Sequence, residues 1–567
     1  MQAGRALLRF APGLAALARY ERRWLARDLL AGVSVAAVAV PVGIAYADLA
    51  GAPPIVGIYS AIFPLLAYAL FGSSRQLIIG PDAATCILVA ATVASHAHGD
   101  AQRYAALLSA LSLLTGVLYL FARAGRLGFI ADFLSQPILI GYLNGIALIV
   151  VVGQLSKLLG YPSASREFID QLQEFAAHWG SGLTATAWLG LSMVAGLLLL
   201  KRLAPALPAP LIGVVAGIVA VVVLDLRSRG VVVTGTLPSG LPQPRLPSVG
   251  PGDYRALLHD AAALMVVSFA SGMLTAKSFA ERNRYSVDAN QELAAFGIAN
   301  VVSGLVQGFP VTGADSRTAV NNAAGGKTQL VGIVAALVMV AVLLFLRGPL
   351  ALVPTAALAA VVLVSALGML DALGLARLAR MSWREGLLSV VTTLGVLVLG
   401  VIPGVSLAIA LSLGWLLVKA SRPNTAVLGR VPGVEGFHST ADQPDGRTEP
   451  GLMIFRFESG LLFFNTAYFR ARLAEALAAS PTPVSWVVLD ASPINWVDAT
   501  ALQSLAELQQ EFAARGVTLG FAGVRHSLSR AFNASAVQQW RRECGIRDFK
   551  TLDEAVRAFE LETRATG

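Results

Sequence analysis

The sequence contains little charge and almost no cysteine. Only 14% of its 567 residues are Asp, Glu, Lys or Arg, whereas 56% are hydrophobic. So little charge, together with many apolar runs of spanning length, excludes an ordinary soluble protein and predicts a polytopic membrane protein. One cysteine, Cys86, lies in an apolar segment and the other, Cys544, near the C-terminus. Two such isolated thiols predict no disulfide framework.

Several functional motifs are also missing. No GxxxxGK[ST] segment is present, so nucleotide-driven pumping is not expected, and no enzymatic constellation stands out. The net charge of +9 does not predict a nucleic-acid partner, because Lys and Arg lie mostly in short loops. His96 and His98 have no further ligands beside them, so we expect no metal and no cofactor, with H⁺ or Na⁺ as a coupling ion. Residues 1–27 are basic and lack a cleavage site, which predicts a cytoplasmic amphipathic segment instead of a signal peptide.

The apolar runs form two sets of seven predicted spans. The first set lies at about 28–47, 54–71, 82–95, 104–122, 130–153, 187–203 and 209–225, and the second at about 257–279, 292–307, 315–326, 328–346, 351–370, 385–402 and 404–419. The third member of each set is too short to cross ~30 Å of hydrocarbon as a helix. We therefore expect extended chain to complete it, which is tolerated at membrane depth only inside protein or along a cavity.

The distribution of Lys and Arg predicts the orientation of the chain. Counting spans from a cytoplasmic N-terminus places the basic loop residues inside, as the positive-inside rule requires. These residues are Arg75, Arg123, Arg126, Lys201, Arg202, Lys277, Arg282, Arg284, Lys327, Arg377, Arg380, Arg384, Lys419 and Arg422. Because seven is odd, the second set enters from the opposite side, so the repeat is inverted. We expect a multi-pass protein of a bacterial-type cytoplasmic membrane with both termini cytoplasmic.

Composition divides the chain into a membrane part and a soluble part. The expected divisions are 28–226 for the first membrane repeat, 227–256 for an outer loop, 257–419 for the second repeat, 420–450 for a linker and 451–567 for a soluble α/β domain. A further outer loop is expected at about 154–186. Hydrophobic patterns predict strands at 452–457, 461–464, 484–489 and 517–521, and helices at about 502–512 and from 553.

Two related six-residue segments occupy corresponding places in the two sets. GPDAAT covers 80–85 and GADSRT covers 313–318, and each joins a short extended run to small, helix-permitting residues. Paired Gly/Pro-interrupted segments of this kind indicate a transporter's binding site. If the halves are inverted, two half-helix N-termini meet near the midplane, where free N–H groups and positive dipole ends favour an anion. The predicted binding residues are Asp82, Ala83, Ala84, Thr85, Gly313, Ala314, Asp315, Ser316, Arg317 and Thr318, with Tyr46 and Phe309 as wall residues.

Arg317 is the strongest candidate among these residues. A charge at the centre of a membrane costs roughly 2.5 to 3.5 kcal/mol on insertion scales, so we expect an anion to compensate it. The alternative is a snorkelling or internally paired arginine. The hydroxyls of Ser316, Thr318 and Thr85 are either donors to the anion or helix caps.

The two carboxylates of the segments allow two interpretations. Asp82 and Asp315 each begin a half-helix, where capping and the helix dipole favour a carboxylate. Two carboxylates and one arginine, however, leave the site formally at −1 before an anion arrives, and like charges in a dry site oppose each other's ionisation. We therefore expect a proton or Na⁺ to enter with the anion, with these two residues as coupling residues.

Several longer stretches resemble the SulP family, the bacterial sulfate permeases related to animal solute-carrier anion exchangers. They are PVGIAYADLAGAPPIVGIYSAIFP from Pro41, IIGPDAATC from Ile78, SQPILIGYLNG from Ser135, NQELAAFGIANVVSGLVQGFPVTGADSRTAVN from Asn290, ASRPNTAVLGRVPG from Ala420 and LLFFNTAYFRARL from Leu461. The resemblance implies 14 spans in a seven-plus-seven inverted repeat with core and gate domains, and a small cytoplasmic STAS domain. It also implies an elevator-like shift of core against gate, an anion between spans three and ten, and a homodimer through STAS and membrane domains.

The sequence departs from the family pattern in three places. Ser271 occupies the place in span eight where many relatives carry a glutamate, so the coupling role falls to Ser271, Asp82 or Asp315. Val42 stands where many have a glutamine. Ala499 stands at the phospho-acceptor serine position of the STAS domain, next to Thr500, so a phosphoswitch there is not expected. Asp498 is predicted to cap the helix that follows.

The expected function is secondary active transport of a small anion. Sulfate, bicarbonate and small dicarboxylates remain open, because a backbone nest with one arginine suits all three. A nucleobase carrier is one alternative, since uracil permease-like proteins resemble this fold and the two aspartates suit ring N–H groups, although Arg317 and the STAS domain argue against it. The other alternative is a non-transporting sensor whose membrane part anchors the STAS domain. The paired half-helices argue against it.

Overall fold

The computed structural model describes residues 11–566 except 133–134, 164, 166, 180–183, 205–206, 237, 239, 444 and 525–546. The chain divides into two compact units, Met1–Ala410 and Leu411–Gly567. Of the amphipathic segment predicted at 1–27, the first ten residues lie outside the described part. The remainder forms α2 (Pro12–Ala18) and a 3₁₀ turn at Arg22–Trp24. Cys544 also lies outside the described residues.

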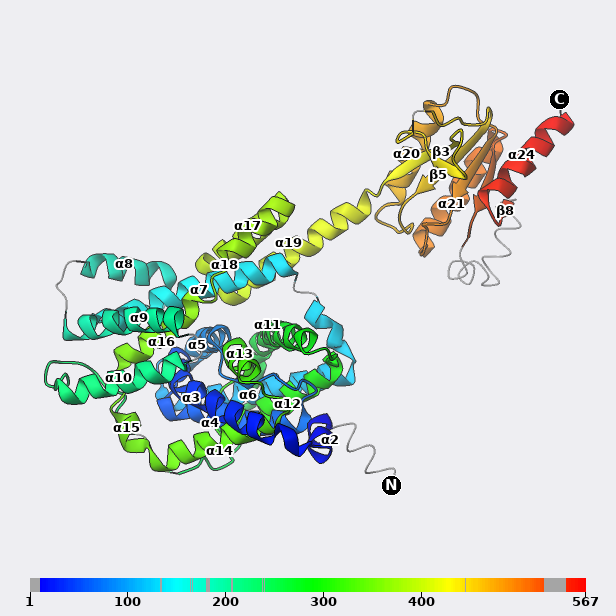
Figure 1. The fold of residues 1–567 in the computed structure, drawn as a ribbon. Coiled ribbons are helices and arrows are strands. Elements are labelled where there is room, and N and C mark those ends of the chain that lie inside the picture. The colour runs from blue at the N-terminus through cyan, green and yellow to red at the C-terminus, as the bar shows by residue number, and fades with distance from the viewer. Residues whose placement is uncertain are drawn as a thin grey trace. The chain divides into compact units, whose positions relative to one another are not determined.

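Each of the fourteen predicted spans corresponds to one helix of the structure, although the bounds differ (Figure 1). The first seven helices are α3 (Leu25–Leu49), α4 (Pro54–Phe71), α5 (Ala83–Ala97), α6 (Ala101–Ala124), α7 (Gln136–Leu159), α9 (Ala185–Leu203) and α10 (Ala209–Val223). The second seven are α11 (Pro251–Arg282), α12 (Ala289–Leu305), α13 (Asp315–Ala323), α14 (Leu330–Phe345), α16 (Thr355–Leu367), α18 (Trp383–Leu399) and α19 (Val401–Ser421). Among the described residues, eight helical segments are long and apolar enough to cross a membrane, and α5, α10 and α14 are shorter apolar helices.

Three described helices of the membrane unit were not predicted, and neither was α20 (Thr466–Ala478) of the second unit. The expected outer loop at 154–186 contains the end of α7 and all of α8 (Phe168–His178), α15 (Arg347–Ala351) follows α14, and α17 (Ala372–Met381) separates α16 from α18. The helices α8 and α17 are short and amphipathic, so a search for runs of spanning length misses them.

The membrane helices pack in two groups. In one group α6 packs on α12, α3 on α14, and α4 on α12 and α3; in the other α7 packs on α18, α16 and α9. Small residues allow these close approaches: a Cβ added to Gly57 of α4 would lie 2.0 Å from the carbonyl oxygen of Gly43 in α3, as is typical of membrane helices. Contacts of α3 with α10 and α16, and of α5 with α7, join the two groups.

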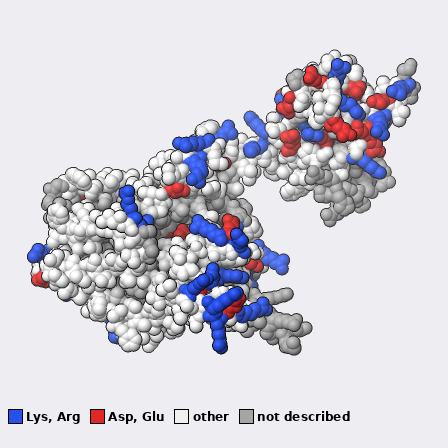
Figure 2. All heavy atoms as spheres, in the orientation of Figure 1, with Lys and Arg blue, Asp and Glu red and all other residues white. Residues whose placement is uncertain are grey.

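Charge is unevenly distributed over the surface of the membrane unit. Figure 2 shows Lys and Arg concentrated on the side near α2, while the surface over α8, α9 and α10 is mostly uncharged. An uncharged flank suits lipid contact, and a basic side suits the cytoplasmic face of a membrane protein.

The second unit contains a six-stranded mixed sheet with strand order β4-β3-β5-β6-β7-β8. Its strands are β3 (Thr425–Arg430), β4 (Phe437–Ser439), β5 (Leu452–Phe457), β6 (Trp486–Asp490), β7 (Thr518–Ala522) and β8 (Arg547–Phe549), and its helices are α20 (Thr466–Ala478), α21 (Ala499–Ala514) and α24 (Leu552–Thr566). From β5 to β8 neighbouring strands are parallel, whereas β3 pairs antiparallel with β4 and β5.

Two predictions for this unit need correction. The linker expected at 420–450 contains β3 and β4, because the polar, turn-forming residues between these strands hide their short hydrophobic runs. The strand expected at 461–464 is wrong: Leu461 forms only an isolated bridge with Val497. The predicted cap of α21 is confirmed, since the Asp498 carboxylate accepts the N–H of Ala501 at 2.8 Å.

Candidate functional site

The two predicted chain breaks lie side by side. Strand β1 (Ile79–Gly80) precedes α5, and β2 (Thr312–Gly313) precedes α13; the two strands pair antiparallel, with Ile79 opposite Gly313. The Ala314 N–H also donates to the Ile78 carbonyl at 2.9 Å. This pairing provides hydrogen-bond partners for extended backbone groups, which find no water at membrane depth. It also brings the N-termini of two half-helices, one from each repeat, to the same place.

Arg317 lies at this junction, one turn into α13. Its side chain is only 1% exposed, and its Nη2 donates to the carbonyl of Pro81 in the other half. A Cβ on Gly80 would lie 2.7 Å from Nη1, so the absence of a side chain at Gly80 makes room for the guanidinium. The arginine therefore bridges the two predicted segments.

Among the described residues the guanidinium forms no close ion pair, although the Asp82 carboxylate acts on it electrostatically. Its Nε is buried without a hydrogen-bond partner, and no carboxylate in the described part of the chain forms an ion pair with it. A buried charge without a counterion is costly. Because two helix N-termini add positive potential at the same point, the junction is suited to an anion.

The two aspartates differ in their surroundings. Asp82 is half-buried and is the N-cap of α5, where its carboxylate accepts the N–H of Ala84 at 3.2 Å. Asp315 is exposed and is the first residue of α13, whose N-cap is Ala314. Its carboxylate accepts a hydrogen bond from the hydroxyl of Thr275 in α11. The capping interpretation is thus confirmed for Asp82 and wrong for Asp315.

The predicted hydroxyl donors are mostly engaged with protein. The Thr318 hydroxyl accepts the N–H of Ile78 at 3.0 Å and so joins α13 to β1. The Thr85 hydroxyl lies 3.4 Å from that of Ser268 in α11, and Thr312 donates to the Ser268 carbonyl at 2.7 Å. Ser316 is exposed at the start of α13. Ser268, which holds both half-helices, was not identified from the sequence.

The remaining predicted residues lie around the junction. Ser271 accepts, through its carbonyl, the hydroxyl of Thr275, one turn further along α11. The Thr275 hydroxyl also makes the side-chain contact with Asp315. Thr275 was not identified from the sequence because it lies in an ordinary apolar span. Tyr46 of α3 is 5% exposed. Phe309 is fully buried, and its backbone N–H donates to Ser60 Oγ at 3.0 Å.

Buried amides support the extended chain before α5. Asn321 Nδ2 donates to the Gln76 carbonyl at 2.7 Å, and Gln329 Nε2 donates to the carbonyls of Ser74 and Leu77 at 2.7 and 3.0 Å. Nearby, the fully buried Glu292 carboxylate accepts from the Tyr68 hydroxyl and from the Ser73 N–H and hydroxyl, each at 2.7 Å. Glu292 therefore holds the loop after α4 through tertiary contacts. In the sequence, these three residues could have been identified only as polar residues within apolar spans.

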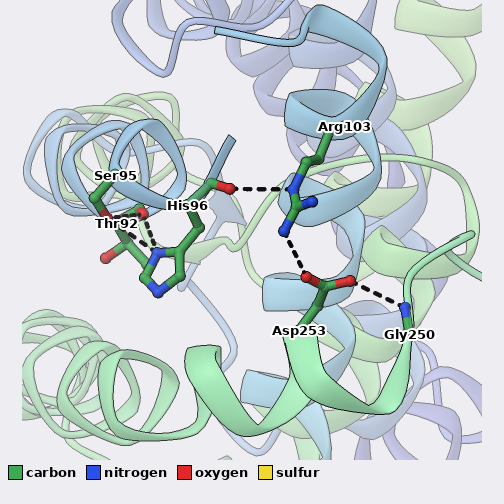
Figure 3. A network of polar contacts seen from close by, with 6 residues as sticks. All are labelled: Thr92, Ser95, His96, Arg103, Gly250 and Asp253. Carbon is green, nitrogen blue, oxygen red and sulfur yellow. Dashed lines mark hydrogen bonds and ion pairs between the residues drawn. The ribbon is translucent and has the colours of Figure 1, made fainter. Parts of the chain in front are cut away.

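His96, near the end of α5, takes part in a polar network (Figure 3). Its Nδ1 contacts the Thr92 carbonyl and the Ser95 hydroxyl, each at 2.9 Å. Arg103 donates to the His96 carbonyl at 3.1 Å and to Asp253 at 2.9 Å. The network joins α6 to the start of α11.

Comparisons with known proteins agree with this architecture. The model for the sulfate permease family matches residues 25–392, and that for the STAS domain matches residues 443–555. A protein of Mycobacterium tuberculosis described as a probable sulfate transporter is 42% identical over 555 residues, which are 97% of this chain and 98% of that protein. The structure is similar to that of SLC26A9, with a TM-score of 0.90 at 23% identity over 100% of this chain and 95% of that one.

A second structural similarity covers the membrane unit. The transmembrane domain of the cyanobacterial bicarbonate transporter BicA matches with a TM-score of 0.61 at 25% identity, over 68% of this chain and 98% of that one. The predicted fold class, a helical polytopic membrane protein with a C-terminal α/β STAS domain, is confirmed by these similarities together.

Proposed function

Because the chain belongs to the sulfate permease family, we propose that it is a secondary active transporter of a small anion, driven by H⁺ or Na⁺. The family's members are transporters and not enzymes, and anion transport is the activity that their names share with the structural relatives. Sulfate is the first substrate to test, since the bacterial relative is described as a probable sulfate transporter. Bicarbonate and small dicarboxylates are the other two substrates to test.

One observation carries this proposal: Arg317 is buried, lacks a carboxylate partner among the described residues, and lies where two half-helices begin. An anion can approach the guanidinium and accept hydrogen bonds from it. Asp315 and Ser316, which precede it in α13, are exposed, so this end of the helix is accessible from outside the protein. Substrate is expected to contact this face of α13 and the start of α5.

The direct test is uptake of labelled sulfate, bicarbonate and fumarate into proteoliposomes with imposed pH and Na⁺ gradients. We expect one of the three anions to accumulate and one of the two gradients to drive it. Replacing Arg317 by glutamine should abolish uptake while the protein remains folded. Uptake of none of the three by folded protein, or full uptake by the glutamine variant, would contradict the proposal.

Charge balance supports coupling to a cation. Asp82 and Asp315 carry −2 together, Arg317 carries +1, and sulfate would bring the total to −3 at one site. A proton on a carboxylate or a Na⁺ near Asp315 and Thr275 reduces this charge. Asp315→Asn and Asp82→Asn should therefore weaken the dependence of uptake on the driving gradient; unchanged dependence on both pH and Na⁺ would exclude these residues as the coupling groups.

The packing supports an elevator-like movement. In this proposal α3–α6 with α11–α14 form the moving core, and the group around α7, α9 and α16 forms the gate. The two groups contact each other mainly through α3 and α5, and the site lies within the core. A homodimer in the cytoplasmic membrane, with both termini cytoplasmic, completes the proposal; the mass of the purified complex tests the assembly.

A further inference from the structure

A hydrophobic groove of about 520 Å³ lies between α17 and α18, away from the anion site. All eight residues that line it are apolar. The helices approach closely at one point, where a Cβ on Gly386 would lie 2.8 Å from both the Cα and Cβ of Ala379. Small side chains at Ala376 and Ala379 leave the groove open on one side, and Trp383 and Leu387 form its other wall.

Large apolar residues of α17 and at the start of α18 are exposed, among them the lining residue Trp383. Leu373 is 81% exposed, Met381 77% and Trp383 67%. Such a patch of large apolar side chains needs an apolar cover. Because α17 follows a membrane-spanning helix directly, lipid chains are the available cover, and a tryptophan at this position is typical of the membrane interface.

Arginines flank the groove. Arg380 follows the lining residue Ala379, and Arg384 follows Trp383, whose ring lies 5.6 Å from the Arg384 guanidinium carbon. Arg377 and Arg380 are exposed and form no ion pair with a carboxylate in the described ranges. The span count puts this loop on the cytoplasmic side, where the leaflet carries anionic lipids that attract basic residues.

We propose that the α17–α18 groove binds one anionic phospholipid of the cytoplasmic leaflet. An acyl chain fills the groove against Ala376 and Leu387, and the headgroup phosphate is bound by Arg380 and Arg384. A second copy of the chain suits this surface less well, because a two-fold symmetric contact places the same patch on both partners and would gather the arginines of both copies. The lipid would bind at α17 and α18, which belong to the proposed gate.

Native mass spectrometry of the full chain, purified in detergent and titrated with lipid, tests the site. Palmitoyl-oleoyl phosphatidylglycerol and phosphatidylcholine carry the same chains and differ in headgroup charge. We expect one phosphatidylglycerol to bind at least tenfold more tightly. The variant Arg380→Gln with Arg384→Gln should bind it about thirtyfold more weakly, equivalent to about 1 kcal/mol for each arginine near a membrane surface.

Three controls separate the alternatives. Arg123→Gln with Arg126→Gln removes two basic residues from another loop on the same side and should leave binding unchanged. Ala376→Phe fills the groove and should weaken both lipids, with Leu387→Ser as a second variant if Ala376→Phe does not fold. Glycerol 3-phosphate should not compete, since it lacks the chains that the groove holds.

The proposal is wrong if the unmodified protein binds the two lipids equally, or if the arginine pair and its control lose the same affinity. It is also wrong if Ala376→Phe keeps full lipid binding. Loss of dimer mass in Ala376→Phe with lipid binding retained would show that a second copy covers the groove instead.

Discussion

The variant Arg317→Gln should separate stability from function. In the absence of substrate, the buried guanidinium leaves Nε without a partner, which costs about 1–3 kcal/mol. Glutamine removes the charge and keeps a polar amide in the position of Nε. We therefore expect the anion-free variant to be at least as stable as the unmodified protein, with an apparent melting temperature equal or a few degrees higher. Most substitutions of a buried residue have the opposite effect.

Added anion should reverse the order of stability. A ligand at a hundred times its Kd stabilises a folded protein by about 2.7 kcal/mol, so the unmodified protein should melt several degrees higher in saturating sulfate. Arg317→Gln should show no sulfate-dependent shift, and Arg317→Lys, which keeps the charge but not the planar fork, should show a reduced one.

The assay is a thermal melt of detergent-purified protein with and without sulfate, together with proteoliposome uptake. Sodium chloride at equal ionic strength is the control for general salt effects. A glutamine variant that melts well below the unmodified protein and still shifts with sulfate would refute the assignment of Arg317 as the anion's partner, and would make it a structural residue.

Further predictions concern the surroundings of the site. Gly80→Ala should lower uptake at least tenfold, because the new Cβ would lie 2.7 Å from Arg317 Nη1; Gly252→Ala, with open space around it, is the matched control, and equal effects would argue against crowding of the arginine. Asn321→Ala leaves the buried Gln76 carbonyl without its donor and should lower stability by about 1–3 kcal/mol in melting measurements, so an unchanged melting temperature would contradict a role in bracing β1. Asp48 in α3 and Lys157 in α7 form an ion pair between the two helix groups; cysteines at both positions (Asp48→Cys, Lys157→Cys), once oxidised, should arrest uptake until reduced, and uptake that continues through the cross-link would exclude a relative movement at this contact. Asp498→Ala removes the cap of α21 and should cost about 1 kcal/mol of stability, measured by denaturant unfolding of the full chain against Thr500→Ala; equal effects would argue against the cap.

The sequence by itself determined the membrane class, the fourteen spans and the two broken segments. These follow from local properties: the length of an apolar run, the breaks introduced by glycine and proline, and the sign of loop charges. The same local logic placed Asp82 at the start of α5 and Asp498 at the start of α21, because an N-cap depends on residues a few positions away. It failed for β3 and β4, where short hydrophobic runs gain their strand character from neighbours in the sheet.

Only the tertiary structure decided which groups meet. Thr275 reaches Asp315, Ser268 holds both half-helices, and Glu292 anchors the loop after α4, although each pair is separated by tens or hundreds of residues. Spacing along one helix cannot predict such contacts, since they depend on how helices from two inverted halves cross. The charge of Arg317 was evident from the sequence, but the absence of a close ion pair with any described carboxylate depends on the packing of the elements around it.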